Sequence, residues 1–210
     1  MTRRGLFLFA ALGVIWGIPY LFIKIAVAEL SPEFLVLARC LLAAALLLPI
    51  AARRRALVPV LRRWKVLLAF AVAEIVLPWY ALNAAEVTLP SSTTGLLLAS
   101  IPLVAIGVAF LFGRRHRVTA LTVLGLLTGT AGVAAVVGLD LGGGDFGAVA
   151  LLSVAVVGYA VGPAILAKYM SDLPGIGVMA LALAASAIIY LPIVGLTGGW
   201  PSSVPSPAVA

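Results

Sequence analysis

Charge is scarce in this chain of 210 residues: Asp, Glu, Lys and Arg make up 10% of it, whereas hydrophobic residues make up 64%. A soluble domain carries about 25% charged residues and roughly 45–50% apolar ones. The composition therefore indicates an integral membrane protein with the lipid bilayer as its partner. The net charge of +7 does not indicate nucleic-acid binding, because the basic residues form short clusters between apolar runs and not one polar face.

Cysteine and histidine are almost absent as well. The single cysteine, Cys40, lies within an apolar run, which excludes an internal disulfide framework and a cysteine-based zinc site. The single histidine, His116, lies in a basic segment without partners at metal-ligand spacing. The sequence thus lacks a nucleophile–base pair or a metal constellation at membrane depth, so we expect no metal, no cofactor and no enzymatic activity.

Seven apolar segments reach or approach the roughly 20 residues that a helix needs to cross a bilayer. Short connections containing Pro, Ser or Gly separate them. Strands are a poor alternative, because the runs are apolar on every side and only helices satisfy all their backbone groups within one segment in lipid. We therefore predict an all-α, polytopic membrane helix bundle with spanning helices at 5–27, 33–51, 66–85, 93–112, 118–137, 146–168 and 175–197.

The basic residues predict the orientation of this bundle. Lys and Arg in the connections lie before the first segment, between the second and third and between the fourth and fifth, and Lys168 ends the sixth. By the positive-inside rule these regions face the cytoplasm, so we expect a multi-pass plasma-membrane protein with a cytoplasmic N-terminus. The connections on the other side contain no Lys or Arg, and their acidic residues are Glu29, Glu33, Glu86, Asp140 and Asp145.

A weak internal repeat appears when the sequence is slid along itself so that Pro32 meets Pro174. Each of these prolines follows one apolar segment and opens the next. The two copies begin at the first and sixth segments, so an odd number of helices separates them and they run in opposite senses. Inverted repeats with a site near the bilayer midplane are a common plan of secondary transporters. The alternative is a chance likeness between two hairpins rich in Leu and Ala.

Several short motifs are similar to one known family. They are Trp16-Gly17 followed by Lys24, Ser31-Pro32 followed by Arg39, the run 83–98, Ile101-Pro102-Leu103, the glycines from Gly125 to Gly132, and Gly144-Asp145. In their order and spacing the chain resembles the EamA family of the drug/metabolite transporter superfamily. The resemblance implies two inverted five-helix repeats, with 1–138 as the first repeat and 144–210 as part of the second.

Two features depart from the family pattern. Gly113-Arg114-Arg115 stands where the family usually has Gly-Glu-Arg, and the chain ends at Ala210 with three helices fewer than the family's ten. We therefore expect a C-terminally truncated member. The resemblance implies a permease or exporter that moves a small metabolite by alternating access. The alternative is a non-transporting fragment that needs the missing helices or a partner chain.

Three ionisable residues within the apolar segments are candidates for substrate binding or coupling, because charge at membrane depth is costly. Glu74 lies about eight residues into the third segment, roughly 12 Å from the cytoplasmic face at 1.5 Å per residue. It is either a proton-coupling or substrate-binding carboxylate or a packing residue. Arg39 is either the ionic partner of Glu74 or a clamp for an anionic group. Lys24 either extends to the lipid headgroups or forms a cationic outer vestibule with Arg39.

Aromatic and small residues complete the candidate set. Trp16 and Tyr20 lie in the first segment and are further candidates for substrate binding or coupling. Trp16 is too deep for an interfacial anchor, so we expect it to line a cavity. Gly125, Gly129 and Gly132 form a small-residue ridge in the fifth segment. Such ridges allow close helix packing, and this one predicts a homodimer contact.

Overall fold

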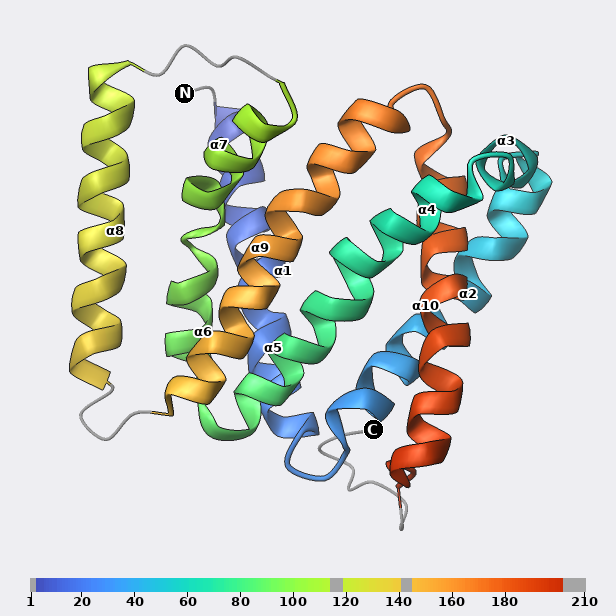
Figure 1. Ribbon diagram of the computed structural model, residues 1–210, viewed down its shortest axis with the longest axis horizontal. Coiled ribbons are helices and arrows are strands. Elements are labelled where there is room, and N and C mark those ends of the chain that lie inside the picture. The colour runs from blue at the N-terminus through green and yellow to red at the C-terminus, as the bar shows by residue number, and fades with distance from the viewer. Residues whose placement is uncertain (1–2, 114–118, 141–144, 202–210) are drawn as a thin grey trace.

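The computed structural model describes residues 3–113, 119–140 and 145–201, without the side chains at 3, 4, 9, 16, 17, 126, 130, 133, 134 and 136–140. Within these ranges the chain forms helices and no strand (Figure 1). The elements are α1 (Arg3–Ala26), α2 (Pro32–Arg53), α3 (Leu57–Leu61), α4 (Trp64–Ala71), η1 (Val72–Val76), α5 (Leu77–Thr88), α6 (Ser91–Leu98), α7 (Ile101–Leu111), α8 (Ala120–Asp140), α9 (Phe146–Tyr169) and α10 (Gly175–Thr197).

Six helical stretches among the described residues are long and apolar enough to cross a membrane: Gly5–Ala26, Pro32–Arg53, Trp64–Thr88, Ser91–Leu111, Phe146–Tyr169 and Gly175–Thr197. They confirm the predicted all-α, polytopic bundle. The segment predicted at 118–137 is a helix, α8, whose described apolar part is Ala120–Gly129. A seventh span therefore stays a prediction.

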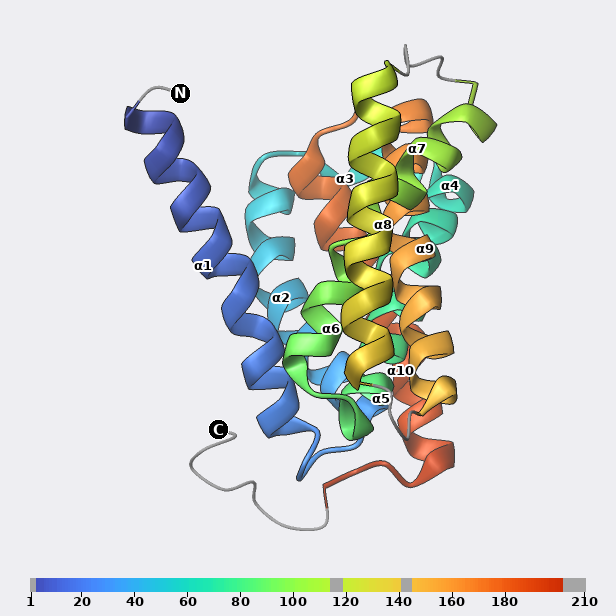
Figure 2. The ribbon, with the colours of Figure 1, turned by 90° about the vertical axis from the view of Figure 1, so that its left-hand side faces the viewer.

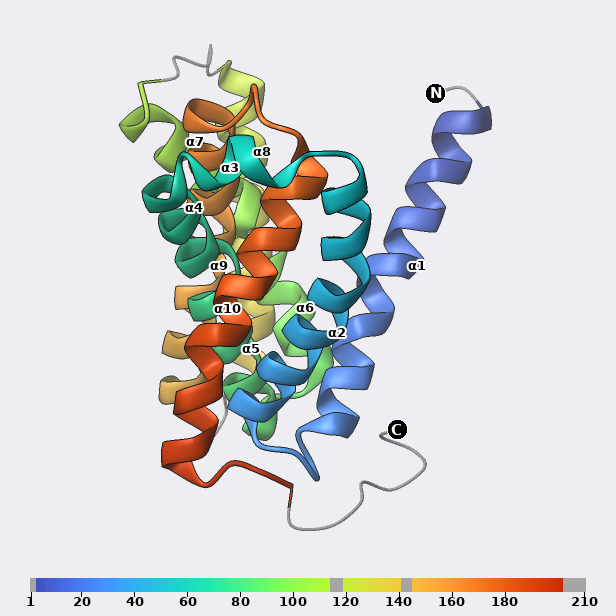
Figure 3. The same cartoon turned by 90° about the vertical axis from the view of Figure 1, so that its right-hand side faces the viewer.

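The helices run alternately up and down through the bundle (Figure 1). The start of α1 and the ends of α2, α7 and α9 lie on one side, here called the N-side, and the starts of α2, α6 and α9 lie on the opposite side. Helix α10 packs along α2, whereas α9 packs along α5 and α7. Figures 2 and 3 show α1 leaning away from the bundle on the N-side and approaching it near its C-terminal end, where it contacts α5 and α6.

Apolar side chains between these helices form two main buried clusters. The larger one joins α2, α4, η1 and α10 and includes Val36, Phe70, Ile75, Val178 and Val194. The second joins α1, α5, α6 and α9, and its fully buried centre is at Ala85, Leu152 and Ala155. Helix α9 also contributes Ile165 to the larger cluster, so it joins the two clusters, whereas α10 packs within the larger one.

The turn between α1 and α2 shows why the second helix begins where it does. Pro32 occupies the first helical turn, where its fixed φ and missing N–H are tolerated. Ser31 caps the helix, since its Oγ accepts from the Phe34 N–H at 3.3 Å and donates to the Gly199 carbonyl at 2.9 Å. The α9–α10 hairpin has nearly the same dimensions: its helices have 24 and 23 residues, and those of the α1–α2 hairpin have 24 and 22.

Two of the long helices change their winding near a proline. Pro78 lacks an N–H and its ring crowds the carbonyl four residues earlier, and the preceding turn, η1, is a wide π-helical turn. A second break, at Ala99 and Ser100, separates α6 from α7 just before Pro102. Pro19 and Pro163, by contrast, lie within uninterrupted α-helices.

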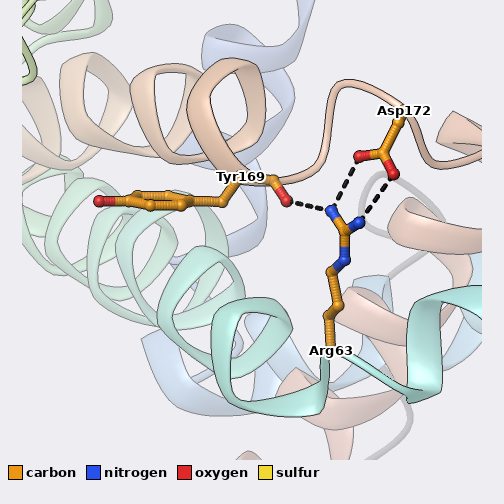
Figure 4. A network of polar contacts seen from close by, with 3 residues as sticks. All are labelled: Arg63, Tyr169 and Asp172. Carbon is orange, nitrogen blue, oxygen red and sulfur yellow. Dashed lines mark hydrogen bonds and ion pairs between the residues drawn. The ribbon is translucent and has the colours of Figure 1, made fainter.

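An ion pair links two connections on the N-side (Figure 4). The Arg63 guanidinium donates to both carboxylate oxygens of Asp172 at 2.8 Å and to the Tyr169 carbonyl at 2.6 Å. The hydrogen bond from Arg63 holds the pKa of Asp172 below its ordinary value. Both side chains are exposed, so the pair contributes little to stability but joins the turn before α4 to the α9–α10 connection.

Candidate functional site

A cavity of about 820 Å³ lies between α1, η1, α6, α7 and α9. Its lining is mostly apolar, with a carboxyl group, two tyrosines and two serines among it: Tyr20, Leu21, Glu74, Ser91, Ser92, Gly95, Leu96, Leu98, Ala99, Ile101, Pro102, Tyr159 and Pro163. Small-molecule sites typically have volumes of roughly 300–1,000 Å³ and few polar groups in an apolar wall. The cavity therefore has the size and chemistry of a site for a small organic molecule.

Among the described lining residues Glu74 alone is charged, and it lies in the middle of η1. Its Oε2 is buried and has no hydrogen-bond partner among the described residues. The carboxyl group packs on Gly162 of α9, where a Cβ atom would overlap Oε2 and approach Glu74 Cβ to 2.9 Å. The wide turn of η1 and the glycine of α9 together hold this carboxyl group at the cavity wall.

Arg39 does not pair with Glu74. Its guanidinium lies over the Trp79 ring, 4.2 Å from the ring centroid, which is a favourable cation–π distance. The ion pair found among the described residues joins Arg63 to Asp172 and does not involve Arg39 or Glu74. Arg39 lies outside the cavity lining, so the structure brings Glu74 and Tyr20 together at the cavity but leaves Arg39 beside it.

Lys24 has a structural role that the sequence did not indicate. Its ammonium donates to three backbone carbonyls at the end of α5, those of Glu86 at 2.6 Å, Val87 at 3.2 Å and Leu89 at 3.1 Å. An ammonium has three donors, so all are used. A cation that caps these carbonyls also interacts favourably with the helix dipole. The ammonium of Lys24 therefore neither extends to the lipid headgroups nor forms a cationic vestibule with Arg39, the two positions expected from the sequence.

The first helix contributes one of its two aromatic candidates to the cavity. Tyr20 lines it, and the Tyr20 backbone carbonyl accepts from Ser91 Oγ at 3.2 Å, which fixes the start of α6 against α1. Trp16 lies within α1, but its side chain is outside the described part of the structure, so its place in a cavity wall stays a prediction. His116 likewise lies outside the described residues.

The burial of two polar residues near the end of α5 was not indicated by the sequence, which places them at a turn. Asn83 and Glu86 are both 0% exposed, although Glu86 was expected in a connection. The predicted third helix ends at residue 85, whereas α5 continues to Thr88 and carries Glu86 inside the bundle. The available signal was the helical spacing of three residues between Asn83 and Glu86, which places both on one face.

Comparison with known protein families matches residues 3–138 to the EamA-like transporter family, which covers more than half of the chain. The chain belongs to the EamA-like transporter family. The resemblance to the drug/metabolite transporter superfamily is thereby confirmed, and an EamA protein is a membrane transporter and not an enzyme. The six apolar spans agree with that class. Neither a curated protein nor a solved structure gives a significant match to the chain.

Proposed function

We propose that this EamA-family protein is a plasma-membrane permease or exporter that moves a small metabolite by alternating access through the cavity between α1, η1, α6, α7 and α9. The observation that carries the proposal is the carboxyl group of Glu74 in the wall of a mostly apolar cavity, with its Oε2 buried and without a hydrogen-bond partner among the described residues. An ionisable group at membrane depth that lacks a protein partner is a functional candidate by default. A proton or a cationic group of the substrate would supply the missing partner.

The helix geometry around Glu74 supports a moving site. Wide π-helical turns occur frequently at functional sites, and η1 carries Glu74 while α6 and α7 are separated by a break on the other wall. Gly162 lets the carboxyl group lie against α9 without a side chain between them. A change in the winding of η1 would move Glu74 relative to α9, which gives substrate or proton binding a way to alter helix packing.

The inverted-repeat organisation belongs to the same proposal, with 1–138 as the first repeat and 144–210 as part of the second. The α1–α2 and α9–α10 hairpins have nearly equal helix lengths, and Figure 1 shows α1 and α9 running in opposite directions. Arg53, Arg63 and Lys168 all belong to the N-side. The positive-inside rule therefore supports a cytoplasmic N-side.

A homodimer through α8 is the proposed oligomeric state. Open space surrounds the Cβ positions of Gly125, Gly129 and Gly132, and α8 packs chiefly against α6. A second copy could approach this ridge closely. Cysteine at position 129 would then cross-link two copies in membranes, whereas cysteine at the lipid-facing Leu46 of α2 would not. Absence of the 129 cross-link would contradict this dimer.

The transport proposal is tested with the full chain in two steps. A thermal-shift screen of amino acids and small amines on the purified protein identifies a ligand, and proteoliposomes then measure its uptake with and without a pH gradient. We expect Glu74→Gln to lower uptake and to abolish its pH dependence. A lost charge-assisted hydrogen bond is worth about 1.5–3 kcal/mol, which corresponds to about tenfold to a hundredfold in affinity.

The matched control is Glu29→Gln, which removes an exposed acid from the α1–α2 connection and should leave uptake unchanged. Unchanged uptake and unchanged pH dependence in Glu74→Gln would refute the role of Glu74.

A further inference from the structure

A second polar cluster lies away from the lining of the cavity, at the end of α5 opposite the N-side. It consists of Asn83 and Glu86 of α5 and Thr94 of α6, each 0% exposed. Four of their oxygen atoms have no hydrogen-bond partner among the described residues: Asn83 Oδ1, Glu86 Oε1, Glu86 Oε2 and Thr94 Oγ1. Buried polar atoms are nearly always hydrogen-bonded, so four such atoms in one place need an explanation.

The donors in this cluster are too few for its acceptors. The Asn83 amide nitrogen donates to the Pro32 carbonyl at 3.1 Å, away from the carboxyl group. The Thr94 hydroxyl lies close enough to interact with the Glu86 carboxyl group, but it carries a single hydrogen, so it can donate to only one of the two carboxylate oxygens. An ionised carboxylate only accepts hydrogen bonds, so an ionised Glu86 would add acceptors to a cluster that lacks donors.

Lys24 does not meet this need. Its ammonium is directed to the backbone carbonyls of Glu86, Val87 and Leu89, which use all three of its donors. A metal cation bound to Glu86 would need further oxygen ligands, such as these backbone carbonyls. The Lys24 ammonium already binds them and adds a positive charge that would repel the metal. A second cation at this position is therefore disfavoured, whereas a proton needs only one acceptor oxygen.

We propose that Glu86 is a proton-binding site at the end of α5, separate from the cavity that contains Glu74. The bound proton makes the carboxyl group neutral and turns one of its oxygens into a donor, with Thr94 Oγ1 of α6 as the acceptor. The titratable and charged groups that act on this carboxyl group from neighbouring helices are Lys24 and Tyr20, both of α1. Two more charged groups lie nearby: Arg39 of α2 acts on Tyr20, and Asp145 at the start of α9 accepts from Thr88 Oγ1 of α5.

Occupancy of this site would affect helix packing. Glu86 lies where α1, α5 and α6 meet, and loss of its proton would leave a buried carboxylate between them whose nearby cation, Lys24, is bound to backbone carbonyls and not to its oxygens. Tyr20 of α1 and Ser91 of α6, which line the cavity, lie on two of these helices. The proton on Glu86 thus stabilises the contact between the helices that form one wall of the cavity.

The test is infrared spectroscopy of the full chain in lipid nanodiscs, which detects protonated carboxyl groups by their C=O stretching band. At pH 7 we expect a protonated-carboxyl component that is lost in Glu86→Gln and retained in Glu33→Gln, and a band from a protonated Glu74 would be a separate component that Glu74→Gln alone removes. We also expect Thr94→Val to shift the frequency of the Glu86 component, because the hydroxyl accepts the carboxyl proton. An unchanged band in Glu86→Gln would mean that Glu86 is ionised, and it would overturn the proposal.

Thermal unfolding provides a second readout that needs no transport. Glutamine is neutral and nearly isosteric with a protonated glutamate, so Glu86→Gln should unfold at about the wild-type temperature at pH 7. A proton held by the folded chain more tightly than by the unfolded chain stabilises at low pH, and this contribution is lost as the pH rises. We therefore expect the unfolding temperature of the wild type to fall relative to that of Glu86→Gln as the pH rises above neutrality. Strong destabilisation of Glu86→Gln at every pH would also overturn the proposal, and neither readout depends on Glu74 or on a substrate.

Discussion

Gly158 provides the sharpest test of how α9 packs on the third span. A Cβ atom at this position would overlap Pro78 Cγ and lie 2.5 Å from the Ala73 backbone oxygen. Neither neighbour can rotate away, since one belongs to a ring and the other to the backbone of η1. Gly158→Ala therefore requires α9 to move away from η1 and α5, which it contacts along much of its length.

The magnitude follows from two opposing terms. Overpacking a well-packed site costs about 1–3 kcal/mol, and the rigid neighbours place Gly158 at the upper end. Replacing glycine by alanine within a helix returns about 1 kcal/mol. The net loss of roughly 2 kcal/mol corresponds to a fall of about 4–8 °C in Tm for a chain of this length.

The assay is thermal unfolding of the purified chain in detergent, with Gly107→Ala in α7 as the control. No atom lies within 4 Å of the Cβ position at Gly107, so alanine there should leave Tm unchanged or raise it by a few degrees. If Gly158→Ala leaves Tm as high as Gly107→Ala does, Gly158 is not in close contact with Pro78 and the Ala73 carbonyl, and the packing of α9 on η1 is wrong.

Three further predictions concern helix ends and the N-side ion pair. Arg55 follows α2 with a φ of 53°, so Arg55→Gly should raise Tm by about 2–4 °C, the effect of roughly 1 kcal/mol of relieved backbone strain, and a lowered Tm would contradict this. Lys24→Met should cost about 2 kcal/mol and lower Tm, because three α5 carbonyls lose their donor, and an unchanged Tm would show that water replaces it without loss. The pKa of Asp172 is lowered by Arg63, so its stabilising contribution is present at neutral pH and is lost as the pH falls through that lowered value. Wild type should therefore be more stable than Asp172→Asn near pH 7, and the two should converge in Tm as the pH falls below roughly 4, whereas a constant difference would contradict the assignment.

Hydropathy and turn residues predicted most of the fold. Helices in lipid satisfy their own backbone groups, so long apolar runs leave few alternatives, and six of the predicted segments are confirmed as apolar spans. The Ser31-Pro32 signal placed the start of α2 within one residue, because capping depends on local chemistry. The motifs around it led to the family that the comparison then matched.

The site depends on contacts that the sequence does not encode locally. Arg39 lies over Trp79, and Lys24 binds carbonyls more than 60 residues away, so these partners follow from which helices are neighbours and how each is rotated. A proline within an apolar run, such as Pro78, disfavours a regular helix but does not specify the wide turn that orients Glu74. Glu86 was assigned to a connection because a charged residue near a predicted helix end resembles a loop residue.

The central claim is that the cavity beside Glu74 holds the transported molecule, and site-directed labelling tests it most directly. Gly95 lines the cavity and has open space at its Cβ position, so Gly95→Cys places a thiol there without a clash. The native Cys40 is 0% exposed and should remain unlabelled by a polar maleimide in the otherwise unaltered chain. We predict that Gly95→Cys is labelled in proteoliposomes and that the transported substrate slows this labelling. Labelling at the same rate with and without substrate would contradict the account.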